Sequence, residues 1–265
     1  MLTFEQIQNT YKLTEPRNDK KRMQLTEYIQ CELLDSLFKQ EGARFLSFIG
    51  GTSIRIVYGG NRFSEDLDFD NFGLSFEGFQ DLLSTVASDM KLKGFEIEYR
   101  FVEKQAFHCH VKFPKILRLH GLTPLDNEKI MVRIDTLQKN RLRPSETFLL
   151  NRFELYRNIL VNPASVILSQ KLIAALERKT PKGRDFYDIS FLYGQTQPDL
   201  DFLEKALNVS PVEFAEKLVE RCRGLDFKAL AEDVKKFLIV PDQIARVETF
   251  PEFIRQRSAS WGVKA

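Results

Sequence analysis

The chain has 265 residues, of which 43% are hydrophobic and 29% are charged, and its formal net charge is +2. This composition predicts a globular protein with one large or two small domains, and it excludes a strongly basic protein that coats nucleic acid. No apolar run approaches the ~18 residues of a membrane span, and the N-terminus lacks the features of a signal peptide. We therefore expect a cytoplasmic protein that does not bind membranes. The scattered cysteines predict no disulfide framework: Cys31, Cys109 and Cys222.

The first half of the chain begins with a helical pattern and continues with a short strand. An apolar stripe predicts helices in the first forty residues: Leu25, Ile29, Leu33, Leu37 and Phe38. Residues 45–49 are apolar and short enough to form a buried strand. Gly50 and Gly51 then let the backbone turn sharply and approach a ligand closely. Thr52 or Ser53 would cap a short helix over 54–58, whose first amides would face an anion.

Two aspartates follow a turn at residues 59–61. Asp66 and Asp68 lie two apart in a strand, so both carboxylates project to one side, with Cα atoms roughly 6 to 7 Å apart. At an effective dielectric near 20, two such charges about 5 Å apart repel by roughly 3 kcal/mol, a cost that a divalent cation removes. Magnesium binds carboxylate and phosphate oxygens together. The order strand, Gly-Gly, helix, Asp-x-Asp therefore predicts a catalytic site rather than an ordinary turn with a solvated hairpin rim.

The remaining pattern predicts a mixed sheet followed by a helical bundle. We expect a helix over 76–91 and strands over 95–102, 107–113, 130–135 and 148–153. After Pro163 the pattern is helical, over 165–179, 185–193, 200–207, 211–222, 227–238 and 250–257. This division predicts a domain over 1–160 with an N-terminal helical cap, and a helical domain over 161–265 that completes an active-site cleft.

A third carboxylate is expected at the end of the strand over 130–135. Alternation places Asp135 on the same face as Arg133, where it would serve as a metal ligand or as the general base. A turn-forming role for Asp135 remains an alternative. Glu98, on a neighbouring candidate strand, is the other candidate for the third carboxylate. His108, His110 and His120 have no fourth ligand at suitable spacing, so we expect packing or surface roles rather than a zinc site.

Four segments carry a family resemblance. These are Gly50-Gly51-Thr52-Ser53-Ile54-Arg55, Arg62-Phe63-Ser64-Glu65-Asp66-Leu67-Asp68-Phe69, Lys171-Leu172-Ile173-Ala174-Ala175 and Arg184-Asp185-Phe186-Tyr187-Asp188. Their order resembles that of the AbiEii/AbiGii toxin family of nucleotidyltransferases, over roughly residues 45 to 193. The resemblance implies an α+β fold with a polymerase-beta-like nucleotidyltransferase sheet, a Mg²⁺ or Mn²⁺ cofactor and a nucleoside triphosphate donor such as ATP, GTP or CTP. It also implies an RNA acceptor, especially tRNA, while the existence of a cognate antitoxin stays open.

The resemblance further implies roles for individual residues. Asp66 and Asp68 would hold metal, where Asp135 could join them by the strand pattern described above, and Asp188 matches a functional aspartate of the last segment. Lys171 would meet the triphosphate. By motif, Gly51 and Ser53 would hold phosphate. Taken with the local patterns, the candidate phosphate-binding set comprises Gly50, Gly51, Thr52, Ser53, Arg62, Ser64, Lys171, Arg178 and Arg184.

Helical spacing adds to this interpretation. Lys171 and Arg178, seven apart, share one side of a helix that could meet an anion. Arg184 and Asp188, four apart, would form a helical ion pair or orient Asp188 toward the cleft. Any RNA binding must come from local basic clusters, although each alone is more often a solvated surface. The clusters are residues 20–22, Lys112 with Lys115 and Arg118, Arg141 with Arg143, and the run 178–184.

The predicted reaction moves a nucleoside monophosphate to an acceptor hydroxyl with release of pyrophosphate. Two alternatives stay open. The acceptor could instead be a protein hydroxyl or a small molecule, or the chain could be a nucleotide-binding regulator without turnover.

Overall fold

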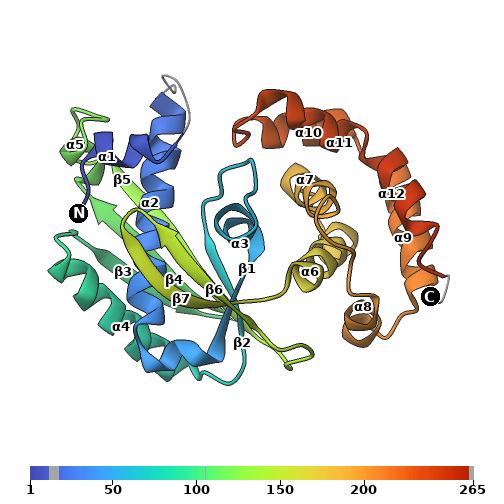
Figure 1. The fold of residues 1–265 in the computed structure, drawn as a ribbon, viewed down its shortest axis with the longest axis horizontal. Helices are drawn as coiled ribbons and strands as arrows, with labels where there is room; N and C mark the ends of the chain where they lie inside the picture. Colours follow the sequence, from blue (N-terminus) through green and yellow to red (C-terminus); the bar gives the residue numbers. More distant parts are fainter. Residues whose placement is uncertain (12–17, 105, 263–265) are drawn as a thin grey trace. The chain divides into compact units, whose positions relative to one another are not determined.

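A computed structural model describes residues 1–11, 18–104 and 106–262 (Figure 1). The chain divides into two compact units. The first unit comprises residues 1–53, 63–141 and 145–161, and the second comprises residues 54–62, 142–144 and 162–265. In the described ranges, no helix combines the length and apolar character that a bilayer crossing requires.

A seven-stranded mixed sheet forms the centre of the first unit, in the order β3-β4-β5-β2-β1-β7-β6. Neighbouring strands pair antiparallel except for β1 with β7 and β2 with β5, which are parallel. This architecture confirms the predicted α+β class. The strands are β1 (Leu46–Ile49), β2 (Leu67–Asn71), β3 (Glu98–Glu103), β4 (Phe107–Pro114), β5 (Lys129–Gln138), β6 (Glu146–Arg152) and β7 (Leu155–Val161).

Helices of the first unit pack against this sheet. The long helix α2 contacts β5, β6 and β7, and α4 contacts both α2 and β3. The sheet residues on the covered face are buried, as shown on β5 by Ile130, Val132 and Ile134. The helical elements are α1 (Phe4–Asn9), α2 (Asn18–Phe38), the 3-10 helix η1 (Glu41–Phe45), α4 (Phe76–Leu92) and α5 (Ile116–Leu119); α3 (Gly50–Ile56) begins in this unit and ends in the second.

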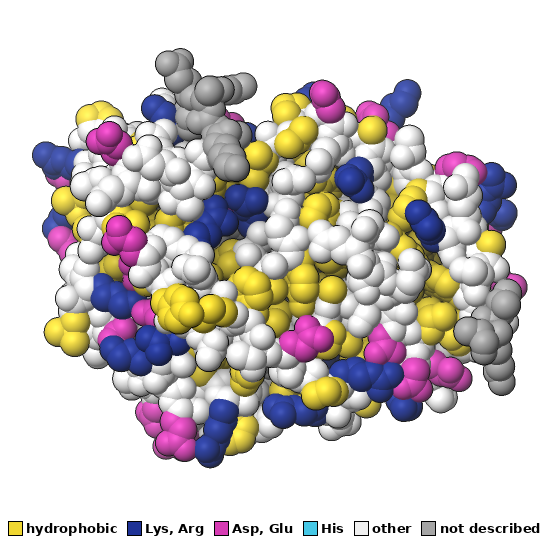
Figure 2. All heavy atoms as spheres, viewed as in Figure 1, with side chains coloured by type: hydrophobic (Ala, Val, Ile, Leu, Met, Phe, Trp, Pro, Cys, Tyr) yellow, Lys and Arg dark blue, Asp and Glu magenta, His cyan; other side chains and the backbone are white. Residues whose placement is uncertain are grey.

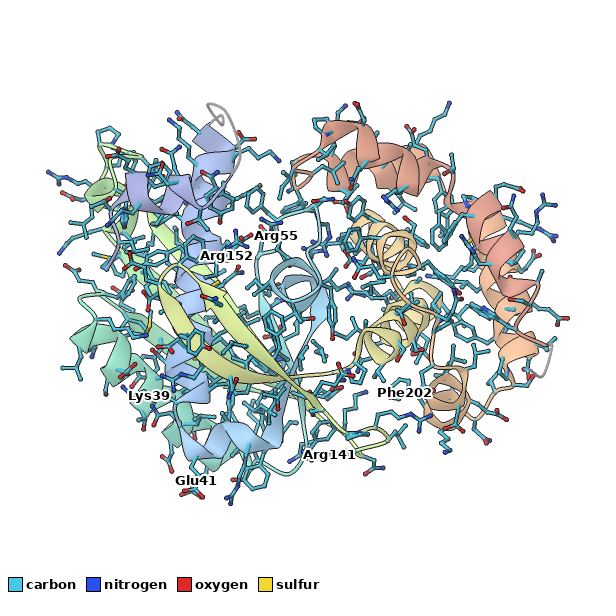
Figure 3. The ribbon with its side chains drawn as sticks, in the orientation of Figure 1. Lys39, Glu41, Arg55, Arg141, Arg152 and Phe202 are labelled. Atoms are coloured by element: carbon cyan, nitrogen blue, oxygen red, sulfur yellow. The ribbon has the colours of Figure 1, made fainter. Side chains whose placement is uncertain are left out.

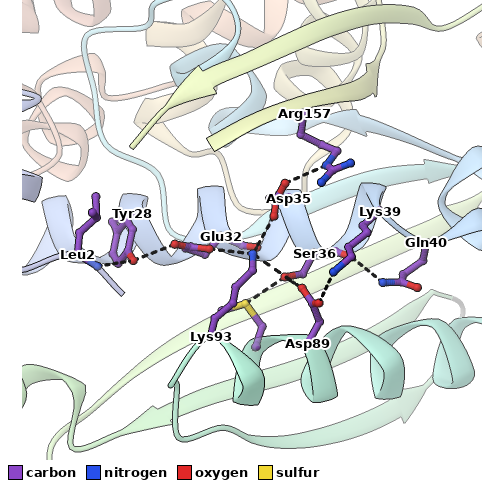
Figure 4. A network of polar contacts seen from close by, with 11 residues as sticks. Leu2, Tyr28, Glu32, Asp35, Ser36, Lys39, Gln40, Asp89, Lys93 and Arg157 are labelled. Atoms are coloured by element: carbon purple, nitrogen blue, oxygen red, sulfur yellow. Dashed lines mark hydrogen bonds and ion pairs between the residues drawn. The ribbon is translucent and has the colours of Figure 1, made fainter. Parts of the chain in front are cut away.

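A polar network joins α2, α4 and β7 within the first unit (Figure 4). Asp35 on α2 accepts from Lys93 Nζ at 2.8 Å and from Arg157 Nε at 2.9 Å. Burial alone would raise the pKa of Asp35, but the hydrogen bonds and charges of Lys93 and Arg157 outweigh it and lower the pKa. Because the carboxylate is favoured in the folded state, it contributes stability above the unfolded pKa near 4, and this contribution is lost as the pH falls through the folded pKa.

We expect Asp35→Asn to lower the free energy of unfolding at pH 7 by about 1.5 to 3 kcal/mol, since hydrogen bonds to charged groups are lost. The variant should also show a weaker loss of stability between about pH 5 and 2. Asp81→Asn on the exposed side of α4 is the matched control. Urea denaturation across this pH range measures both effects, and equal pH dependence in the wild type and Asp35→Asn would contradict the assignment.

The second unit is helical and is built around α7. This helix contacts α6, α10, α11 and α12. Its Phe186 ring centre lies 5.0 Å from that of Phe227 and 4.9 Å from that of Phe250, which forms an aromatic core. The elements are α6 (Ala164–Glu177), α7 (Gly183–Leu192), α8 (Leu200–Leu207), α9 (Pro211–Arg223), α10 (Phe227–Lys235), the 3-10 helix η2 (Pro241–Ile244), α11 (Ala245–Glu248) and α12 (Phe250–Ser258).

Gly183 allows the start of α7 to contact the backbone of α10. A Cβ atom at this position would lie 1.8 Å from the carbonyl oxygen of Leu230. We expect Gly183→Ala to lower the free energy of unfolding by about 1 to 3 kcal/mol, because the steric conflict with Leu230 outweighs the better helix propensity of alanine. Gly224→Ala, whose Cβ would lie 3.8 Å from the nearest atom, is the control. Thermal unfolding compares the two variants, and an unchanged Tm for Gly183→Ala would contradict this packing.

One strand, β7, was not predicted from the sequence. Arg152 and Leu155 pair directly, so β6 and β7 form a hairpin with a loop of only Phe153 and Glu154. Both loop residues have positive φ, at 54° and 63°. Such turns normally contain glycine or asparagine, and neither occurs at the two loop positions, so the sequence carries no turn signal where β6 ends and β7 begins.

Charged side chains of both signs are interspersed on the face shown in Figure 2, in keeping with the net charge of +2. Several of the predicted basic clusters are neutralised locally. Lys115 pairs with Glu96, Arg118 with Asp126, and Arg143 with Asp199 and Asp201. Arg141, labelled in Figure 3, lies over the Phe72 ring at 4.4 Å from its centre. These residues therefore form separate contacts rather than one basic surface.

Candidate active site

Strand register in the first unit brings together the three predicted carboxylates. Asp68 on β2 pairs with Ile49 at the end of β1 and with Asp135 on β5. Asp66 immediately precedes β2. Glu98, the rival third carboxylate, lies on the edge strand β3 and pairs with Lys129 at 3.0 Å. Asp135, and not Glu98, is therefore the carboxylate on the strand next to Asp68.

Gly50 packs directly against Asp68. Its φ is 79°, and a Cβ atom there would lie 2.3 Å from Asp68 Oδ2. Only glycine adopts this conformation readily and also leaves room for the carboxylate. The tight turn between β1 and α3 is thus coupled to the position of Asp68.

The predicted cap of α3 was wrong. The helix begins at Gly50, so Thr52 and Ser53 lie inside its first turn rather than before it. Both side chains are buried: Thr52 Oγ1 donates to the carbonyl oxygen of Asp66, and Ser53 Oγ donates to that of Gly50 at 2.9 Å. The Thr52 hydroxyl ties the start of α3 to the residue that supplies the first carboxylate. Gly51, in the same turn, is also buried.

Arg133 and His108 complete the carboxylate site, and neither was predicted to belong to it. Arg133 Nη2 lies 2.8 Å from Asp66 Oδ2, and its Nε lies 2.7 Å from Asp135 Oδ2. Burial would lower the pKa of Arg133, but the charges of Asp66, Asp135 and Asp68 raise it. His108 Nδ1 lies 2.8 Å from Asp135 Oδ1. Strand alternation had placed Arg133 beside Asp135, but only cross-strand register could place His108 there.

The carboxylate site suits a hard cation. Asp66, Asp68 and Asp135 offer only carboxylate oxygens, the donors that Mg²⁺ and Mn²⁺ prefer. Over the described residues, no group of three His, Cys, Asp or Glu side chains has an arrangement ready to hold a metal ion. Arg133 supplies the positive charge between Asp66 and Asp135. The chemistry of the donors therefore fits a divalent ion, whose binding would have to compete with this guanidinium.

A buried charge cluster in the second unit contains most of the other predicted site residues. Arg62 Nε and Nη2 donate to the two oxygens of Asp188 at 2.7 and 2.6 Å. Lys171 Nζ lies 2.9 Å from both Asp185 Oδ1 and Asp188 Oδ2. Arg178 Nε lies 3.2 Å from Asp185 Oδ2. Asp185, absent from the predicted site, thus joins Lys171 to Arg178.

The charged side chains of this cluster are buried, so each charge depends on an oppositely charged partner. The side chains of Arg62 and Asp188 are 2% and 1% exposed, and that of Lys171 is 12% exposed. Burial would raise the pKa of Asp188, but the charges of Arg62 and Lys171 lower it. Burial would likewise lower the pKa of Lys171, and Asp185 and Asp188 raise it. All three groups are therefore held in their charged forms.

Two further predicted phosphate-binding residues also contact other parts of the chain. Arg184 lies over the Phe237 ring, 5.8 Å from its centre. The backbone carbonyl of Ser64 accepts from Gln30 Nε2 at 3.1 Å. The predicted site residues thus form one group around Asp68 in the first unit and another around Asp188 in the second. Their phosphate-binding roles remain predictions.

A mixed sheet with an Asp-x-Asp pair after a Gly-Gly turn is the arrangement expected of a nucleotidyltransferase. The family model described as nucleotidyl transferase AbiEii toxin, type IV TA system, matches residues 32–250. The chain therefore belongs to the AbiEii nucleotidyltransferase toxin family, which confirms the resemblance, and it is an enzyme that uses a nucleoside triphosphate.

Solved structures share the fold. The MenT4 nucleotidyltransferase toxin from Mycobacterium tuberculosis has 20% sequence identity and a TM-score of 0.59, over 98% of this chain and 94% of that chain. JHP933 from Helicobacter pylori has 18% identity and a TM-score of 0.54, over 90% of this chain and 94% of that chain. At these identities the likeness concerns the fold alone. No curated protein sequence matches the chain.

Proposed function

We propose that this nucleotidyltransferase moves a nucleoside monophosphate from a triphosphate to a hydroxyl of RNA, tRNA in particular, and releases pyrophosphate. The observation that carries the proposal is the register of Asp68 with Asp135, beside Asp66 and Gly50. Asp66, Asp68 and Asp135 would hold Mg²⁺, or Mn²⁺ in its place. A divalent ion bound there would neutralise negative charge on the phosphates as the acceptor oxygen attacks.

The chain's own residues would position the triphosphate. The Gly50–Ser53 turn offers backbone amides, and Thr52 fixes that turn to Asp66. Lys171 has three donor protons, of which Asp185 and Asp188 can accept two. We propose that the third binds a phosphate oxygen, with Asp188 and Arg62 positioning the ammonium group. Asp135 would act as metal ligand or as general base, and His108 would orient it.

The match to the AbiEii toxin family and the likeness to the MenT4 toxin support a toxin role. We propose that the enzyme acts in the cytoplasm, where RNA and triphosphates are available, and that a cognate antitoxin limits its activity.

Incubation with each α-labelled nucleoside triphosphate and total RNA tests the proposal. We expect label on RNA of tRNA size with one or a few of the triphosphates, only when Mg²⁺ or Mn²⁺ is present. The Asp68→Asn variant should transfer no label. Label on protein or on a small molecule, with none on RNA, would contradict the proposed acceptor and leave the transfer chemistry intact.

A further inference from the structure

Four strands of the first unit, β2, β5, β4 and β3, place their side chains in rows that extend from the carboxylate site. Asp68, Asp135 and His108 occupy one row across β2, β5 and β4. Two residues further along β5, the next row contains Arg133, His110 and Arg100. A third row contains Met131, Lys112 and Glu98. Registered residues on neighbouring strands share one face, so all three rows belong to a single sheet face.

The part of this face next to the carboxylate row is exposed and basic. Arg100 and Lys112 are exposed, and Met131 is 53% exposed. In the part of the chain that the structure describes, Arg100 and Lys112 have no carboxylate partner, unlike Lys115, Arg118 and Arg143. Glu98 is neutralised by Lys129 at 3.0 Å. We name Arg100, His110, Lys112, Met131 and Arg133 the open sheet face.

We propose that the open sheet face binds the last phosphodiester groups of the RNA acceptor next to its reacting hydroxyl. The proposal rests on the proposed function, since it assumes that the acceptor is RNA. Strand geometry supplies the spacing: rows two residues apart are separated by roughly 6 to 7 Å, and neighbouring strands by roughly 5 Å. With a terminal hydroxyl beside Asp68 and Asp135, Arg100 and Lys112 lie within reach of the preceding one or two phosphates.

The chemistry of the face favours a single-stranded nucleic-acid end over a protein surface. Its unpaired charges are cationic, and phosphates are the anions that Arg and Lys neutralise in nucleic-acid complexes. Met131, the register partner of Lys112, adds a flexible apolar side chain against which an unstacked base can lie.

The run 178–184 in the second unit offers a competing surface. Its Arg178 is paired with buried Asp185, but Lys179 is exposed and Lys182 is half-buried. RNA binding through that run would make Lys179 and Lys182, and not Arg100 and Lys112, responsible for the salt dependence of affinity. The two surfaces can therefore be separated by paired substitutions.

The test measures RNA affinity across a salt series for the whole protein. Loss of two phosphate contacts on a single strand should make the slope of log affinity against log salt shallower by about 1.4. We expect this change for the double variant Arg100→Ala with Lys112→Ala, together with a higher KM for RNA and a retained kcat. The double variant Arg44→Ala with Lys91→Ala removes equal charge from η1 and α4 and should keep the wild-type slope. A variant that exchanges the two cations, Arg100→Lys with Lys112→Arg, should also keep the wild-type slope. Such a result would show that the double alanine variant acts through lost charge and not through misfolding.

Each outcome decides the proposal. A wild-type slope in the Arg100 and Lys112 double variant would overturn it, as would a change seen only with Lys179→Ala and Lys182→Ala. If the wild type itself has no RNA affinity at low salt and labels protein or a small molecule, the proposed RNA acceptor fails as well. If the wild type labels RNA while the sheet variant binds normally, only the present inference fails.

Discussion

Asp68→Asn is expected to reduce nucleotidyl transfer by at least about a thousandfold, which corresponds to roughly 4 kcal/mol of transition-state stabilisation. The substitution removes one charge from the three carboxylates that the β2 and β5 register brings together. The fold should persist, because removal of a like charge relieves repulsion with Asp66 and Asp135. Asp66→Asn should behave in the same way. The measurements are initial rates with saturating Mg²⁺ and Tm without metal.

Glu65→Gln is the matched control for this prediction, because Glu65 is exposed and immediately precedes Asp66. It should keep close to wild-type rates. Full activity in either aspartate variant would show that these carboxylates do not hold a catalytic metal, whereas a large fall in Tm would assign them a structural role.

Asp188→Asn is expected to lower the free energy of unfolding by about 3 to 5 kcal/mol. The asparagine would leave two buried cations, Arg62 and Lys171, without the carboxylate that now binds both. Because Arg62 and Lys171 hold the pKa of Asp188 below its usual range, its contribution is present at neutral pH. The contribution should be lost only as the pH falls through the folded pKa. Denaturant unfolding at pH 7 measures the effect.

Asp233→Asn is the control, since this aspartate is exposed on α10 of the same unit. It should change stability little. If Asp188→Asn unfolds at the wild-type denaturant concentration but transfers no nucleotide, the cluster would have a catalytic role without the structural one assigned to it.

Local sequence patterns predicted the centre of the first unit well. Apolar residues at 45–49 and the following glycines predicted β1 and its turn, and alternation over 130–135 placed Asp135 beside Arg133. These features depend on neighbours in sequence, where side-chain period and glycine conformation are decisive. The family resemblance and the α+β class were confirmed by the family match and the fold.

Features that depend on distant residues could not be predicted in this way. The Arg62–Asp188 pair joins residues 126 positions apart, and the Arg133–Asp66 pair joins residues 67 apart. The charge pattern favoured a local pairing of Arg184 with Asp188, yet the structure pairs Asp188 with Arg62 and Lys171. Tertiary packing thus selects partners among equally charged residues, and sequence spacing alone does not.

The start of α3 shows a different limit. Thr52 and Ser53 are typical capping residues, and their position after two glycines suggested a cap. Instead Gly50 begins the helix with a positive φ, and the Thr52 hydroxyl bonds to the carbonyl of Asp66. A long-range contact therefore replaced the local one that propensity favours.

Binding of a divalent ion by Asp66, Asp68 and Asp135 can be measured without turnover. Electron paramagnetic resonance of Mn²⁺ titrated into the protein with a non-hydrolysable triphosphate analogue reports bound ion directly. We expect saturable binding in the wild type and its loss in Asp68→Asn, with Glu65→Gln unchanged. Equal Mn²⁺ binding by the wild type and Asp68→Asn would contradict the assignment of a metal-dependent nucleotidyltransferase site to these carboxylates.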